Sequence, residues 1–165
     1  MVIPMKKTLT PRLLLTLVLL TAAAAAVHLA CASETVPGAL VLEADGKETA
    51  FSPDTLPVIP VEGESVNGRD EVRTVHEEGW ALGDVLKAAG FDPAGLASVT
   101  VLAADGYSAA VSGGELREEG RVYLLRREGP SFRLIVFGDP DSRRSVKDVV
   151  RLIPEKAAEA AVPAA

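Results

Sequence analysis

The chain has 165 residues, 48% of them hydrophobic, and its 17 Lys and Arg against 23 Asp and Glu give a formal net charge of −6. This length allows one folded domain. The acidic balance argues against nucleic-acid binding, which depends on neutralising phosphates with Lys and Arg.

The first 32 residues are predicted to form a signal peptide. Lys6, Lys7 and Arg12 precede an uncharged apolar run at 13–27, which is the layout of a secretory signal. The run has about fifteen residues, whereas a bilayer-spanning helix needs roughly twenty. We therefore expect an exported protein, periplasmic or extracellular, whose net charge without these three basic residues is about −9.

The processing of this leader has three interpretations. The leading interpretation is ordinary signal-peptidase cleavage after Ala32, because Ala30 and Ala32 are the small residues that such a cleavage site requires. Cys31 is a candidate for lipidation, although a lipobox normally has leucine at the place of His28. An uncleaved anchor is the third. Membrane contact is expected only through the leader or a lipid anchor.

Short strands dominate the chain after a linker at 33–38. Apolar alternation predicts strands at 39–44, 47–51, 58–61 and 71–76. Asp45-Gly46 predicts a hairpin turn, and Ser52-Pro53 predicts a single helical turn. Pro60 makes 58–61 an edge strand or an extended loop, and the polar residues 62–70 are expected to form a surface loop.

One amphipathic helix is predicted in the middle of the chain. Leu82, Val85, Leu86 and Ala89 fall at helical spacing. Gly90 stands just past the end, where a left-handed cap is easiest for glycine.

The second half of the chain returns to strands. They are predicted at 99–102, 107–111, 122–125, 132–137 and 146–153. We expect the very apolar 132–137 to be central, the residues 115–120 to form a charged turn, and the Ala-rich residues 155–165 to be a disordered tail. The domain at 39–154 is thus α+β, a mostly antiparallel or mixed β-sheet with one main helix.

Five motifs occur in an order that is known from one family. They are Gly79-Trp-Ala-Leu82 to Gly90, Asp105-Gly-Tyr107, Tyr123-Leu-Leu125, Gly129-Pro-Ser-Phe-Arg133-Leu134, and Ser145-Val-Lys147 to Ile153. The chain from about residue 41 to 153 resembles the sulfite-oxidase-type molybdopterin-binding domain family. The resemblance implies the fold of this family. It also implies a molybdenum centre held by a pterin dithiolene and, in the sulfite-oxidising members, by a cysteine thiolate of the protein as well.

The sequence departs from this family at the cofactor. Cys31, the one cysteine, lies at the processing site, so the folded domain has no thiolate for a metal. The loop at 126–128 is also short. We therefore expect neither sulfite oxidase activity nor stoichiometric molybdenum, although the resemblance still admits molybdopterin. His76-Glu77-Glu78 lacks ligand spacing, and no metal or catalytic residue is predicted.

The resemblance also implies a ligand site. Arg133, Arg144, Ser145 and Lys147 match positions that contact the pterin, and with Tyr107 they are expected to surround one cleft. Arg and Lys suit anionic groups. The alternatives are that Tyr107 packs beside the helix, that Arg144 is solvated, and that Arg133 pairs with a carboxylate.

Three functions are consistent with these residues. The leading hypothesis is an exported, non-catalytic module that binds an anionic small molecule or an envelope protein partner. The second is a molybdopterin-dependent oxidoreductase that needs no cysteine ligand. The third is an accessory subunit of an electron-transfer complex.

Overall fold

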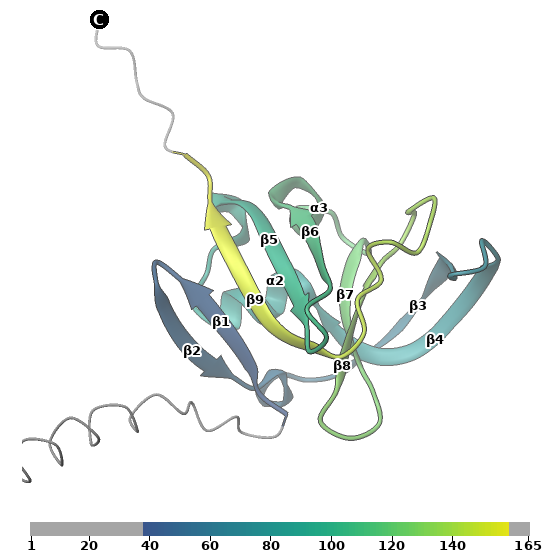
Figure 1. Cartoon of the computed structure of the whole chain (residues 1–165), viewed down its shortest axis with the longest axis horizontal. Helices are drawn as coiled ribbons and strands as arrows, with labels where there is room; N and C mark the ends of the chain where they lie inside the picture. The colour runs from purple at the N-terminus through teal and green to yellow at the C-terminus, as the bar shows by residue number, and fades with distance from the viewer. Residues whose placement is uncertain (1–37, 159–165) are drawn as a thin grey trace, which may run out of the picture. The chain divides into compact units, whose positions relative to one another are not determined.

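The computed structural model describes residues 38–158 (Figure 1). The predicted signal peptide with Cys31, nearly all of the linker, and residues 159–165 of the predicted tail lie outside them. The elements are β1 (Leu40–Ala44), β2 (Lys47–Phe51), η2 (Pro53–Thr55), β3 (Ile59–Val66), β4 (Val72–Ala81), α2 (Leu82–Ala88), η3 (Pro93–Gly95), β5 (Leu96–Ala103), β6 (Ser108–Ser112), α3 (Gly113–Arg117), β7 (Val122–Arg126), β8 (Phe132–Val136) and β9 (Val149–Lys156). Neither α-helix in this part of the chain is long and apolar enough to cross a membrane.

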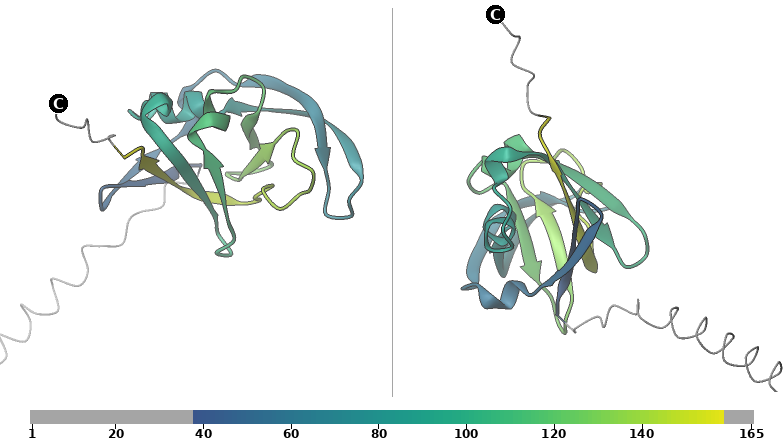
Figure 2. Two further views of the ribbon diagram at one scale, coloured as in Figure 1. Left: turned by 90° about the horizontal axis from the view of Figure 1, so that it is seen from above. Right: turned by 90° about the vertical axis from the view of Figure 1, so that its left-hand side faces the viewer.

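The described strands form two sheets. One has the order β2-β1-β9-β5-β6, and the other has the order β3-β4-β7-β8. Neighbouring strands are antiparallel except β1 and β9, which are parallel. The α+β class with one main helix is confirmed. The sequence predicts one sheet, whereas the structure has two, because none of the described ladders joins a strand of one group to a strand of the other (Figure 1 and Figure 2).

The main core lies between the two sheets and α2. The first sheet contributes Leu42 and Val101, the second contributes Trp80 and Leu124, and α2 contributes Leu86, all at most 2% exposed. The predicted helix therefore buries its apolar face as its spacing required. Gly90 follows it with a φ of 93°, a left-handed conformation that glycine adopts without strain.

Strand β8 corrects one prediction. The sequence predicts a central strand, but β8 lies at the edge of its sheet, beside β7. Its apolar sequence reflects burial on both faces, since Leu134 belongs to the main core and Ile135 to a second cluster. The outer edge is partly covered by residues 137–148, here called the strap, because the Leu134 N–H donates to the Val146 carbonyl at 2.8 Å.

The predicted loop at 62–70 is also corrected. Residues up to Val66 belong to β3, which pairs with β4 from Ile59↔Gly79 to Val66↔Val72. Tertiary packing explains the strand, because a Cβ at Gly63 would lie 2.8 Å from the Phe137 ring. In Figure 1 this long β3–β4 hairpin curves away from the first sheet.

Two predicted boundaries also differ. The expected turn at 115–120 begins as α3, whose start is a capping box of Ser112 and Glu115. The last strand begins at Val149 and continues to Lys156, so residues 146–148 belong to the strap. Glu155 and Lys156, expected in the tail, pair with β5.

Candidate functional site

The second sheet carries a charged row on the face turned away from the main core. Odd-numbered residues of β4, β7 and β8 point to this face, because side chains alternate along a strand. Val75, Leu125 and Ile135 form part of its small apolar cluster. Next to them, Arg127 donates to the Glu77 carboxylate at 2.9 Å. One half of this face is therefore apolar, and the other half is charged.

An open groove of two recesses crosses the charged half. The hairpin recess, about 650 Å³, lies between the β3–β4 hairpin and the strap. The loop recess, about 870 Å³, lies beside the loop that joins β7 to β8. Both are lined by Glu77, Arg133 and Lys147, so they are continuous. The hairpin recess has three cationic side chains, Arg73, Arg133 and Lys147, and one carboxylate, Glu77.

Arg133 projects from β8 into this groove. Its Nε and Nη2 donate to the Ser145 hydroxyl at 3.1 and 2.9 Å. Burial lowers the pKa of the Arg133 guanidinium; the Glu77 carboxylate opposes this change, and Arg127 adds to it. Within residues 38–158 no carboxylate forms an ion pair with Arg133. Its charge, which an arginine keeps in proteins, is therefore poorly compensated.

The strap supplies the other two groups of the site. The Ser145 N–H donates to the Ser142 carbonyl at 3.0 Å, and Lys147 is exposed at the groove. The structure therefore brings Arg133, Ser145 and Lys147 together, three of the five residues that the sequence grouped.

Tyr107 lies outside the groove. It is 48% exposed, just before β6, and its hydroxyl donates to the Arg143 carbonyl. It lines neither recess. The alternative that it packs beside the helix is not what the structure shows either, because the contact is with the strap.

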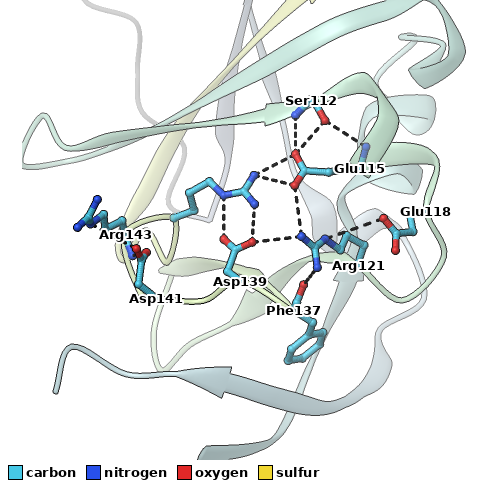
Figure 3. Close-up of polar contacts among 9 residues, drawn as sticks. Ser112, Glu115, Glu118, Arg121, Phe137, Asp139, Asp141 and Arg143 are labelled. Atoms are coloured by element: carbon cyan, nitrogen blue, oxygen red, sulfur yellow. Dashed lines mark hydrogen bonds and ion pairs between the residues drawn. The ribbon is translucent and has the colours of Figure 1, made fainter. Parts of the chain in front are cut away.

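The side chain of Arg144 lies in an ion-pair network and not in the groove. It donates to Asp139 through Nε at 2.8 Å and also through Nη2, and it donates to Glu115 through Nη1 at 2.9 Å. Arg121 contacts the same two carboxylates, Asp139 at 3.3 Å and Glu115 at 3.6 Å. Figure 3 shows Arg121 in contact with both the Glu115 and the Asp139 carboxylates. The sequence missed this network, whose only signal is the Ser112-x-x-Glu115 capping box.

The network gives Glu115 a pH-dependent role in stability. Burial alone would raise the pKa of its carboxyl, but the Ser112 backbone N–H and Arg144 lower it from 4.5 to about 2. A lowered folded-state pKa contributes stability above the unfolded value, and this is lost as the pH falls through the folded value.

We expect Glu115→Gln to lower the free energy of unfolding by about 1–2 kcal/mol near pH 7, after allowance for solvent screening. The difference from wild type should shrink between about pH 4.5 and 2, because wild type itself becomes protonated there. Urea unfolding at several pH values measures this. Glu118→Gln, at a side chain 64% exposed, is the control, and a pH-independent difference would contradict the prediction.

The comparisons with known proteins give a fold and no family. No family model and no curated protein matches the chain. Among solved structures, it is similar to the sulfane dehydrogenase SoxCD from Paracoccus pantotrophus, with a TM-score of 0.53 and 16% identity. The match covers 71% of this chain and 38% of that one, so this protein spans well under half of the SoxCD chain. At this identity the likeness shows the fold alone, and it supports the distant resemblance drawn from the motifs.

The donor groups of the groove do not fit a molybdenum centre held by a protein thiolate. No cysteine occurs after Cys31, and residues 38–158 hold no cluster of three His, Cys, Asp or Glu able to bind a metal. The carboxylates that line the groove are Glu77, Glu78, Glu128 and Asp148. Glu77 is paired with Arg127, and Asp148 accepts from the Ser131 hydroxyl. The cations at Arg133 and Lys147 suit an anion instead.

Proposed function

We propose that this protein is a non-catalytic module of the cell envelope that binds an anionic small molecule through Arg133, Ser145 and Lys147. The observation that carries the proposal is the half-buried Arg133 guanidinium, whose partner is a neutral hydroxyl. Most arginines of the described part pair with a carboxylate: Arg73, Arg121, Arg126, Arg127, Arg143, Arg144 and Arg151.

An anion in the hairpin recess would supply the missing countercharge. Arg133 offers a planar set of donors and Lys147 a point charge, and both are stronger donors to an anion than to a neutral group. The surrounding protein is acidic, so the recess is a local reversal of sign. Such a reversal concentrates small anions more than the net charge would suggest.

The groove supports binding better than catalysis. Ser145 already accepts both hydrogen bonds from Arg133. His76, which lines the hairpin recess, has its Nδ1 3.5 Å from the Glu62 carboxylate. Nucleophilic catalysis requires a base within hydrogen-bond reach of the nucleophile, and the groove residues offer no such pair. Export through the predicted leader at 1–32 would place this site in the envelope.

Calorimetric titration with inorganic phosphate at low ionic strength tests the proposal. We expect a dissociation constant of about 1 mM, as suits a small, open, charged site. Arg133→Gln should weaken binding about tenfold or more, and Lys147→Gln by less. Added salt should weaken binding in wild type because it screens these charges.

Arg143→Gln is the matched control. It removes the same charge from an 86% exposed side chain on the strap, and should change affinity by less than about twofold. Absence of binding in wild type, or an equal loss in Arg133→Gln and Arg143→Gln, would contradict the proposal. About one molybdenum per chain, with a pterin, in protein purified from its native host would favour the oxidoreductase instead.

A further inference from the structure

Arg144 is one of the side chains that link the strap to the rest of the domain. The guanidinium bridges Asp139, near the start of the strap, and Glu115, in the first turn of α3. Asp139 is only 7% exposed and Glu115 19% exposed. Charge-assisted pairs with this much burial are screened less by solvent than ordinary surface pairs.

The anchor at Glu115 is itself held in place. The Ser112 N–H donates to the Glu115 carboxylate at 3.0 Å, and the Ser112 hydroxyl accepts from the Glu115 N–H at 3.3 Å. Arg121 adds a second link, since it contacts both carboxylates and donates to the Phe137 carbonyl at the start of the strap. In Figure 3 these contacts form one connected set between the α3 segment and residues 137–139.

Arg144 is directly followed by the residue that contacts Arg133. Ser145 accepts both hydrogen bonds from the Arg133 guanidinium, and the next carbonyl, of Val146, accepts from Leu134 on β8. The side chains of Arg144 and Ser145 thus face opposite ways, one to the network and one to the groove. Because the two residues are adjacent, the position of Arg144 constrains that of Ser145, together with the Val146–Leu134 hydrogen bond.

We infer that Arg144 is a positioning residue of the anion recess, which holds the strap so that Ser145 stays on Arg133 and Lys147 stays over the groove. This inference rests on the proposed function, because it assigns a role within that same recess. The sequence grouped Arg144 with the residues that contact the ligand, whereas this inference has Arg144 act on the ligand indirectly, by positioning Ser145 and Lys147. A site held in its binding geometry loses less freedom when the ligand enters.

The experiment compares Arg144→Gln, Arg144→Lys and Arg143→Gln with wild type in phosphate affinity. Arg144→Gln should weaken phosphate binding about fivefold to tenfold, because the recess must then be ordered on binding. Arg144→Lys should restore part of this, since lysine keeps the charge but not the fork. Arg143→Gln should change little, because Arg143 pairs with Asp141 of its own strap and not with α3.

A spectroscopic readout separates positioning from general destabilisation. Without phosphate, the Arg133 Nε–Hε resonance should move toward the position of a solvated arginine in Arg144→Gln and stay in place in Arg143→Gln. Asp139→Asn, which removes one partner of Arg144, should act in the same direction and serves as the test if Arg144→Gln does not fold.

Two results would overturn the inference. One is an unchanged Arg133 resonance in folded Arg144→Gln, and the other is an equal affinity loss in Arg144→Gln and Arg143→Gln. If wild type does not bind phosphate, the proposed function is overturned. The resonance comparison then still decides whether Arg144 positions Ser145 against Arg133.

Discussion

Replacing Gly113 with alanine should cost about 3 kcal/mol or more of folding free energy, because overpacking against rigid atoms is costly. A Cβ at this position would lie 2.0 Å from the Leu96 carbonyl oxygen and 3.3 Å from that of Ala97. Both are backbone atoms at the start of β5, so α3 would have to move away from the strand. Glu115 would move with it and lose its place beside Arg144.

Gly114→Ala provides the control one residue along the chain. A Cβ there would meet only the Ser112 hydroxyl at 3.7 Å, an ordinary contact. We expect stability equal to wild type or up to about 1 kcal/mol higher, because alanine reduces the entropy of the unfolded chain. Urea unfolding followed by circular dichroism compares the two variants, and equal stabilities would show that α3 is not pressed against β5.

Replacing Trp80 with alanine should cost about 3–5 kcal/mol, the range for a large buried aromatic. Trp80 is 2% exposed on β4 and packs edge-on against Phe132 with ring centroids 6.0 Å apart. Its indole N–H donates to the Leu56 carbonyl at 3.3 Å, and the Arg126 guanidinium lies 5.4 Å from the ring centroid. The residue therefore ties the second sheet to the η2 segment.

Two variants of the same strand calibrate this loss. Trp80→Phe keeps an aromatic ring but removes the N–H, and should cost less than Trp80→Ala. Val72→Ala, at a side chain 65% exposed, should change stability by less than about 0.5 kcal/mol. Thermal unfolding followed by circular dichroism measures all three. Similar melting temperatures for Trp80→Ala and Val72→Ala would contradict the assigned core.

Local signals explain which parts of the fold could be predicted. The apolar spacing of Leu82 and Leu86 located α2, and the turn at Asp45-Gly46 located the β1–β2 hairpin. The place of β8 in its sheet could not be predicted from such local signals. The apolar content of a strand indicates that its faces are buried, but it does not indicate which strands are its neighbours. The length of β3 depends on Gly63 meeting Phe137, a contact between residues far apart in the sequence.

The same distinction holds for the site. Arg133 belongs to a regular strand, so alternation fixes the face on which it lies. Arg144 belongs to the strap, where no periodicity fixes the direction of a side chain, and its grouping with Ser145 and Lys147 did not reveal that it points to Glu115. The capping pair Ser112 and Glu115 is visible in the sequence, but its contact with Arg144 is a tertiary feature.

The most direct test of the anion recess follows the arginine Nε–Hε resonances of the purified protein during titration with phosphate. We predict that the Arg133 resonance shifts saturably, with a midpoint equal to the calorimetric dissociation constant, while the Arg143 resonance stays nearly constant. An Arg133 resonance that does not respond, or that moves in parallel with the resonances of exposed arginines such as Arg143, would contradict the account.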